Sequence, residues 1–130
     1  MRRGVTILEI LVVVIIIGII AAISVFTNTE RDRGREGETV LGLIHQAEKR
    51  YSMDNSGVYY TCSPGCTKAL IQQYLGIDIH AVYFTYSIAK RTTTAGFRAT
   101  ATRIGTGNCA TKTMTVSDLS GQVQKGCSLW

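Results

Sequence analysis

Apolar residues are concentrated at the start of the chain. In residues 5–26 only Thr6, Glu9, Gly18 and Ser24 interrupt an otherwise apolar run. As a helix these roughly 22 residues rise about 33 Å, enough to cross a hydrocarbon core of about 30 Å. Because a lone segment in lipid must satisfy its own backbone hydrogen bonds, the pattern predicts a membrane-spanning helix despite its many Val and Ile residues.

A charged stretch continues the predicted helix. Opposite charges recur three residues apart from Glu30 to Glu38, as on an exposed helix face. We interpret every charge here as part of a solvated face. Gly34 and Gly37 each weaken a helix by about 1 kcal/mol relative to Ala, so we expect this stretch to bend or melt easily.

An amphipathic pattern follows the charged stretch, and together they form the second half of the predicted helix, residues 27–57. Apolar residues return at steps of three and four, with Glu48, Lys49 and Arg50 around them. These apolar residues are Val40, Leu41, Ile44, Ala47 and Tyr51. Residues 55–57 (NSG) end the pattern. We expect one helix of about 50 residues, whose first half is in lipid and whose second half packs against the rest of the chain.

The remainder, residues 58–130, predicts a small sheet. Residues 68–75 (KALIQQYL) before Gly76 indicate a short helix. Alternation of apolar and polar residues predicts strands at 82–88, 97–102 and 113–117, the last followed by a turn at 118–121. An antiparallel meander with one apolar face can cover the amphipathic helix. The fold class is therefore α+β, with a long N-terminal helix packed against a small antiparallel sheet.

Charge and cysteine positions indicate an exported head. Arg2 and Arg3 precede the apolar run and no basic residue follows before Arg31, so the positive-inside rule leaves the N-terminus in the cytoplasm. All four cysteines then lie on the side where disulfides persist. They are Cys62, Cys66, Cys109 and Cys127.

Four cysteines allow three connectivities, and the sequence does not choose among them. We favour Cys62–Cys66 across the turn-forming residues 63–65, and Cys109–Cys127 around the last strands. Zinc binding is the alternative, but the spacings C-x3-C and C-x17-C fit paired zinc knuckles poorly. We predict no metal site and no cofactor.

Catalytic residues are not evident, and we predict that the chain is not an enzyme. Residues 87–90 (SIAK) match S-x-x-K, but they lie in a predicted strand and no K-T-G companion follows. His45 lies on the amphipathic helix and is interpreted as packed or solvent-facing, and His80 is the only other histidine.

The first 25 residues resemble the prepilin signature shared by type IV pilins and type II secretion pseudopilins. In that family a prepilin peptidase cuts after the Gly that ends a short basic leader. The mature chain begins with an aromatic or apolar residue and has Glu at its fifth position. Here residues 1–4 (MRRG) are similar to the leader and residues 5–9 (VTILE) to the mature start. Gly18 and the IIAAI after it match the family's usual continuation.

The resemblance implies a role for the one carboxylate of the apolar run, which costs about 3 kcal/mol in hydrocarbon. Cleavage between Gly4 and Val5 creates an α-ammonium on Val5, protonated in part at neutral pH. Glu9 and a neighbouring subunit's Val5 can then neutralise each other in a filament core and set the axial stagger. Spacing along a helix also allows a pair within one chain. Snorkelling of Glu9 to the headgroups is the alternative without a partner.

Two departures from the family pattern matter. Val5 replaces the usual Phe or Met, which leaves its N-methylation open. Phe26 stands where many family members have a helix-kinking Pro, so we expect a straighter helix with flexibility moved toward Gly18 or toward Gly34 and Gly37.

The resemblance also implies a cellular setting. It places the precursor in the bacterial inner membrane with a periplasmic head, and then in a filament of pilin-like subunits built by inner-membrane assembly machinery. Major pseudopilins typically bind calcium through C-terminal carboxylates, and beyond Asp78 this chain has only Asp118. The region between Cys109 and Cys127 instead resembles the disulfide-bounded region of type IV pilins. We predict a type IV pilus subunit, with a type II secretion pseudopilin as the alternative.

Two further hypotheses follow from the residues alone. An ordinary secretory signal cleaved after Ala22 would release a soluble disulfide protein, but Glu9 and the length of the apolar run argue against it. From residue 60 onward seven basic residues stand against two acidic ones, a net +5. A filament of such heads would attract DNA or anionic surfaces, with simple solubility as the alternative.

Overall fold

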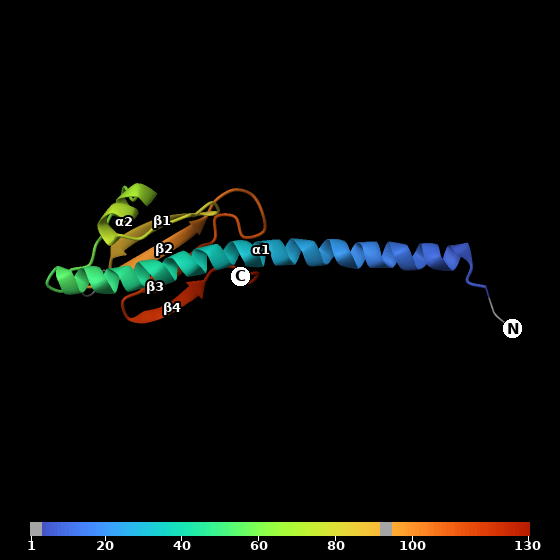
Figure 1. Ribbon diagram of the computed structural model, residues 1–130, viewed down its shortest axis with the longest axis horizontal. Coiled ribbons are helices and arrows are strands. Elements are labelled where there is room, and N and C mark those ends of the chain that lie inside the picture. The colour runs from blue at the N-terminus through green and yellow to red at the C-terminus, as the bar shows by residue number, and fades with distance from the viewer. Residues whose placement is uncertain (1–3, 92–94) are drawn as a thin grey trace.

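The computed structural model describes residues 4–91 and 95–130, with the side chains of residues 25–28 left aside. In chain order the elements are α1 (Ile7–Asp54), α2 (Lys68–Leu75), β1 (Phe84–Lys90), β2 (Phe97–Arg103), β3 (Thr113–Ser117) and β4 (Ser120–Lys125). The sheet and α2 lie along the C-terminal half of α1, and the N-terminal half extends away alone (Figure 1). The expected α+β architecture is confirmed.

Helix α1 is a single element of 48 residues with both ends capped. Thr6 is the N-cap, and its hydroxyl accepts a hydrogen bond from the backbone N–H of Glu9. At the other end the Asn55 N–H donates to the Tyr51 carbonyl. The residues that follow, Ser56 and Gly57, have positive φ angles of 57° and 83°, so the chain turns away there. The expected helix of about 50 residues is therefore confirmed.

The glycines of α1 that we expected to weaken the helix lie at its closest contacts with the head. A Cβ on Gly34 would lie 2.5 Å from Cδ1 of Trp130, and one on Gly37 would lie 3.1 Å from Cζ of Phe84. Because glycine has no side chain, the rings of Trp130 and Phe84 pack directly against the backbone of α1 at these positions. Helix α1 runs unbroken through both glycines, and the expectation that this stretch bends or melts easily stays a prediction.

The sheet is an antiparallel meander in the order β1-β2-β3-β4. Its register aligns the inward residues in rows: Ile88 pairs with Ala99 and Ala99 with Val116. Phe97 and Met114 are fully buried, as are Leu41 and Ile44 on α1. The amphipathic face of α1 thus meets the apolar face of the sheet, as the periodicities predicted.

The C-terminal strand β4 was missed by the sequence reading. Its residues, SGQVQK, are mostly exposed and carry no apolar alternation. It pairs with β3 from Ser117↔Ser120 to Met114↔Lys125, which leaves a turn of two residues, Asp118 and Leu119, in place of the expected turn at 118–121. Backbone pairing rather than side-chain burial defines this edge strand.

Both disulfides join the pairs that we favoured. The Cys62–Cys66 loop lies against the free edge of β1, because the N–H groups of Cys62 and Ser63 both donate to the Ile88 carbonyl. Cys109–Cys127 joins the loop after β2 to the segment after β4, with Cα atoms 5.7 Å apart. With all four sulfurs paired, none is a thiolate ligand for zinc.

Charged residues of α1 connect the helix to the head instead of forming only a solvated face. One carboxylate oxygen of Glu36 accepts from the N–H groups of Val82 (3.0 Å) and Tyr83 (2.9 Å). Glu38 forms an ion pair of 2.7 Å with Lys125 on β4. Our interpretation of these charges as solvated was wrong for Glu36, and also for Glu30, which is buried.

Candidate processing and assembly site

The backbone at the predicted cleavage point is not helical. Gly4, Val5 and Thr6 precede the first turn of α1, which begins at Ile7. A Cβ added at Gly4 would meet no heavy atom within 4 Å, and Val5 is 65% exposed. The bond between Gly4 and Val5 thus lies between two exposed residues outside the helix. The N-cap Thr6 lies beyond it, so cleavage there would leave the cap in place.

The Glu9 side chain lies in the first turn of α1. Its backbone N–H donates to the Thr6 hydroxyl at 3.3 Å, and a carboxylate in this turn also interacts favourably with the helix dipole. Within the described part of the chain, the Glu9 carboxylate forms no ion pair. In the uncleaved chain the helix begins at Ile7, so Val5 precedes its first turn. The pair between Glu9 and the α-ammonium of a cleaved Val5, within one chain or between subunits, stays a prediction.

The surface around Glu9 is an exposed apolar cylinder. The large apolar residues from Val5 to Ile23 are between 45% and 85% exposed, because nothing in the head covers them. This helix is long and apolar enough to cross a membrane. More than a dozen such side chains cannot remain in water, since each gains about 1.5–3 kcal/mol on burial. The N-terminal half of α1 therefore needs lipid or other apolar helices around it.

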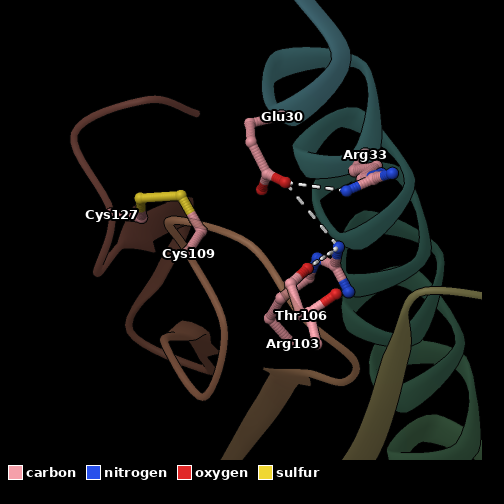
Figure 2. Close-up of a disulfide and its surroundings, with 6 residues drawn as sticks. All are labelled: Glu30, Arg33, Arg103, Thr106, Cys109 and Cys127. Atoms are coloured by element: carbon pink, nitrogen blue, oxygen red, sulfur yellow. Dashed lines mark hydrogen bonds and ion pairs between the residues drawn. A yellow bond between two sulfur atoms is a disulfide. The ribbon is translucent and has the colours of Figure 1, made fainter. Parts of the chain in front are cut away.

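A second charged site lies where α1 enters the head (Figure 2). The Glu30 side chain, 8% exposed, accepts from Arg33 at 2.8 Å and lies 3.8 Å from Nη2 of Arg103. The Arg103 side chain is only 3% exposed, and it also donates to the Thr106 carbonyl. The Cys109–Cys127 disulfide holds the loop that contains Thr106. Helical spacing predicted the contact between Glu30 and Arg33, but no local signal pointed to Arg103.

Glu48, one of the charged residues around the apolar positions of the amphipathic helix, is a buried carboxylate. It is fully buried, and one of its carboxylate oxygens accepts a hydrogen bond from the backbone N–H of Tyr60 at 3.0 Å. Its other oxygen has no hydrogen-bond partner among the described residues. Desolvation raises the pKa of Glu48 to about 7, against the smaller opposing effect of the hydrogen bond from Tyr60.

Histidine and serine positions agree with structural roles. His45 is half-buried beside Phe97, and burial lowers the pKa of its imidazole. His80 forms an exposed pair with Asp78 at 2.8 Å. Ser87 and Lys90 lie on β1, where residues three apart point to opposite faces, so the S-x-x-K match does not assemble a site. In residues 4–91 and 95–130, no group of three metal-ligating side chains comes together.

Ion pairs reduce the head's effective positive charge. Arg103 lies beside Glu30, Arg91 forms a pair with Asp118 at 3.4 Å, and Lys125 forms one with Glu38. Four of the seven basic residues counted in the sequence are exposed and form no ion pair within the described part of the chain: Lys68, Lys90, Arg98 and Lys112. DNA binding stays a prediction with weaker electrostatic support than the net charge suggested.

Comparison of the chain with models of known protein families, with curated proteins and with solved structures finds no match.

Proposed function

We propose that this chain is a pilin-like structural subunit, anchored in the bacterial inner membrane as a precursor and assembled into a type IV pilus after cleavage between Gly4 and Val5. The observation that carries the proposal is the division of α1. Its C-terminal half is covered by the sheet, and its N-terminal half is a bare apolar cylinder with one carboxylate, Glu9, in its first turn.

Lipid and a filament core are the two surroundings that suit such a cylinder. In lipid the helix satisfies its own backbone hydrogen bonds, and in a filament the same face packs against copies of itself. A carboxylate fits the second setting only with a cation beside it, because an uncompensated buried charge costs about 3–5 kcal/mol. The α-ammonium of a processed neighbour supplies that cation without any further residue.

The structure of the precursor end supports processing. A peptidase needs accessible, non-helical backbone, and the exposed residues 4–6 provide it immediately before the helix. Prepilin peptidase, other pilin-like subunits and inner-membrane assembly machinery are the partners of this proposal. A secretion pseudopilus is built from the same kind of subunit, and a surface filament that contains this chain as its dominant protein would distinguish a pilus from it.

The test combines processing with filament isolation. In cells that produce the chain, the mature form in the membrane should begin at Val5, and Gly4→Val should leave full-length protein there. Sheared surface filaments should contain the processed form. A mature N-terminus at Ile23, or processed protein released into the medium as a soluble head, would contradict the proposal and favour ordinary secretion.

A further inference from the structure

A pocket of about 290 Å³ lies at the end of the head from which the apolar half of α1 extends. Arg33 of α1 lines it together with Tyr83 before β1, Arg103 at the end of β2 and the loop that follows. Figure 1 shows this loop, in orange, at the side of the head nearest the free half of the helix. Figure 2 shows the side chains of Arg33 and Arg103 converging on Glu30.

The pocket contains more positive than negative charge. Two guanidinium groups share the single carboxylate of Glu30, at 2.8 Å from Arg33 and 3.8 Å from Arg103. The Nε atoms of both arginines are buried and have no hydrogen-bond partner among the described residues. A guanidinium binds a phosphate or carboxylate through its N–H donors. The Arg33 side chain is 29% exposed, against 3% for Arg103, so Arg33 is the guanidinium that an anion can reach. One further anion would balance the charges.

An aromatic ring and an apolar rim complete the pocket. The Cζ atoms of Arg33 and Arg103 lie 5.1 Å and 5.3 Å from the centroid of the Tyr83 ring. Val82 and Ile104 on the rim are 68% and 42% exposed. Tyrosine is enriched at the headgroup level of membranes, and arginine is well suited to phosphate recognition. This combination fits a headgroup with acyl chains below it better than a free anion in water.

The position of the pocket along α1 agrees with that chemistry. Glu30 is four residues beyond the apolar run of residues 5–26 and Arg33 is seven, which places them about 6 Å and 10 Å above it. Each polar headgroup layer of a bilayer is about 5–8 Å thick. With the apolar run in the membrane, the pocket mouth is at or just above the headgroups.

We propose that this pocket binds the phosphate of an anionic phospholipid and so holds the head upright on the membrane before assembly. The proposal rests on the membrane anchoring proposed above. Arg33 would contact the phosphate, and the nearly buried Arg103 would contribute its positive charge beside it. Glu30 would keep both guanidinium groups in place, and Val82 and Ile104 would contact the lipid's glycerol and upper acyl region.

The test uses the full chain in nanodiscs of phosphatidylcholine with a minority of phosphatidylglycerol, followed by native mass spectrometry of the lipids that stay bound. We expect one retained phosphatidylglycerol in preference to phosphatidylcholine. Arg33→Gln should reduce that preference by about fivefold, the effect of one Arg at an anionic surface. Arg33→Lys keeps the charge but loses the planar guanidinium, so its preference for phosphatidylglycerol should lie between those of wild type and Arg33→Gln. This intermediate value would show that the loss in Arg33→Gln is not caused by a folding defect.

Arg35→Gln is the matched control. Arg35 is two residues away on the same helix, is 73% exposed and pairs with Asp32, and it does not line the pocket. Its removal should change lipid retention by less than about twofold. Equal retention by wild type and Arg33→Gln, or an equal loss in both variants, would overturn the pocket as the lipid site.

Other occupants give different results. Displacement of the retained lipid by inorganic phosphate at millimolar concentration would show a site for free anions and overturn the lipid proposal. If Arg33→Gln retained lipid normally but failed to form filaments, the pocket would serve a neighbouring subunit's carboxylate instead. Failure of the wild-type chain to insert into nanodiscs would contradict the anchoring itself, which is a separate outcome from loss of lipid preference.

Discussion

The indole ring of Trp130, the last residue of the chain, lies directly on Gly34 of α1. A Cβ added at Gly34 would lie 2.5 Å from Cδ1 and 2.7 Å from Cγ of that ring. The ring also contacts Phe84 at the start of β1, with centroids 5.6 Å apart. The end of the chain thus covers the helix where it enters the head, and the glycine is what allows the approach.

Gly34→Ala should therefore lower the stability of the head, although the same change usually favours a helix by about 1 kcal/mol. The methyl group must displace the base of the Trp130 side chain, and overpacking of this kind costs about 1–3 kcal/mol. Gly42 offers the control, because a Cβ there meets nothing within 4 Å. Thermal unfolding should show Gly42→Ala as stabilising and Gly34→Ala as destabilising.

The assignment to Trp130 can be checked with a double mutant. In a Trp130→Ala background the two ring contacts are absent and only the Cβ of residue 130 remains, 3.0 Å from the added Cβ. Gly34→Ala should therefore be clearly less destabilising there than in the wild-type background. Equal destabilisation in both backgrounds would contradict contact with the indole as the cause.

Glu36 should stabilise the entry to β1 through its two backbone hydrogen bonds. In Glu36→Ala the N–H groups of Val82 and Tyr83 lose their acceptor, at a cost of about 1–3 kcal/mol, and their amide hydrogen exchange should accelerate. Glu36→Gln retains an acceptor oxygen and should have a smaller effect. Glu38→Ala removes only a half-exposed ion pair and should cost at most about 1 kcal/mol. Unchanged exchange at Val82 and Tyr83 would contradict the proposed role.

Glu48 should make the head less stable as the pH rises. Its pKa is raised to about 7 in the folded chain from 4.5 for the free group. The folded state therefore binds more protons between these values, and stability is greatest below about pH 4.5 and falls until the pH passes about 7. The loss should be about 3 kcal/mol, since the carboxylate must then ionise without a cation beside it.

The measurement compares denaturant unfolding of wild type and Glu48→Gln from pH 5 to pH 8. The glutamine keeps an acceptor for the Tyr60 N–H and does not titrate. The free energy of unfolding of Glu48→Gln should therefore not show the decrease with rising pH that we expect for wild type. The lowered pKa of His45 acts in the opposite direction, because stability from its neutral form is lost as pH falls below 6.5. His45 is present in both proteins, so its contribution cancels in the difference. Parallel curves for the two proteins would contradict the prediction.

Glu9→Gln should separate insertion from assembly. The variant keeps size and polarity but cannot neutralise a neighbour's Val5 ammonium. That ammonium would then be a buried charge with no partner, at a cost of about 3–5 kcal/mol for each subunit. We expect normal amounts of protein processed after Gly4 in the membrane and few surface filaments when the variant is the only copy. Abundant filaments of that variant would show that the ion pair is unnecessary.

The local pattern of the sequence determined most of the secondary structure. The long helix, α2 and the first three strands each have a periodicity that depends only on neighbouring residues. Strand β4 has no such pattern, since it is an exposed edge strand defined by backbone pairing with β3. Gly4, Val5 and Glu9 could be proposed as processing and assembly residues because the pattern that suggests these roles is contained in one short segment.

Only the tertiary structure decided which charges and glycines of α1 are buried. Glu48 lies under Tyr60, Glu30 lies beside Arg103, and Gly34 lies under Trp130. In each case the covering residue comes from a later segment of the chain, so helical spacing could not reveal it. A solvated charge and a buried charge look the same in the sequence, because burial depends on what the rest of the chain places over that position.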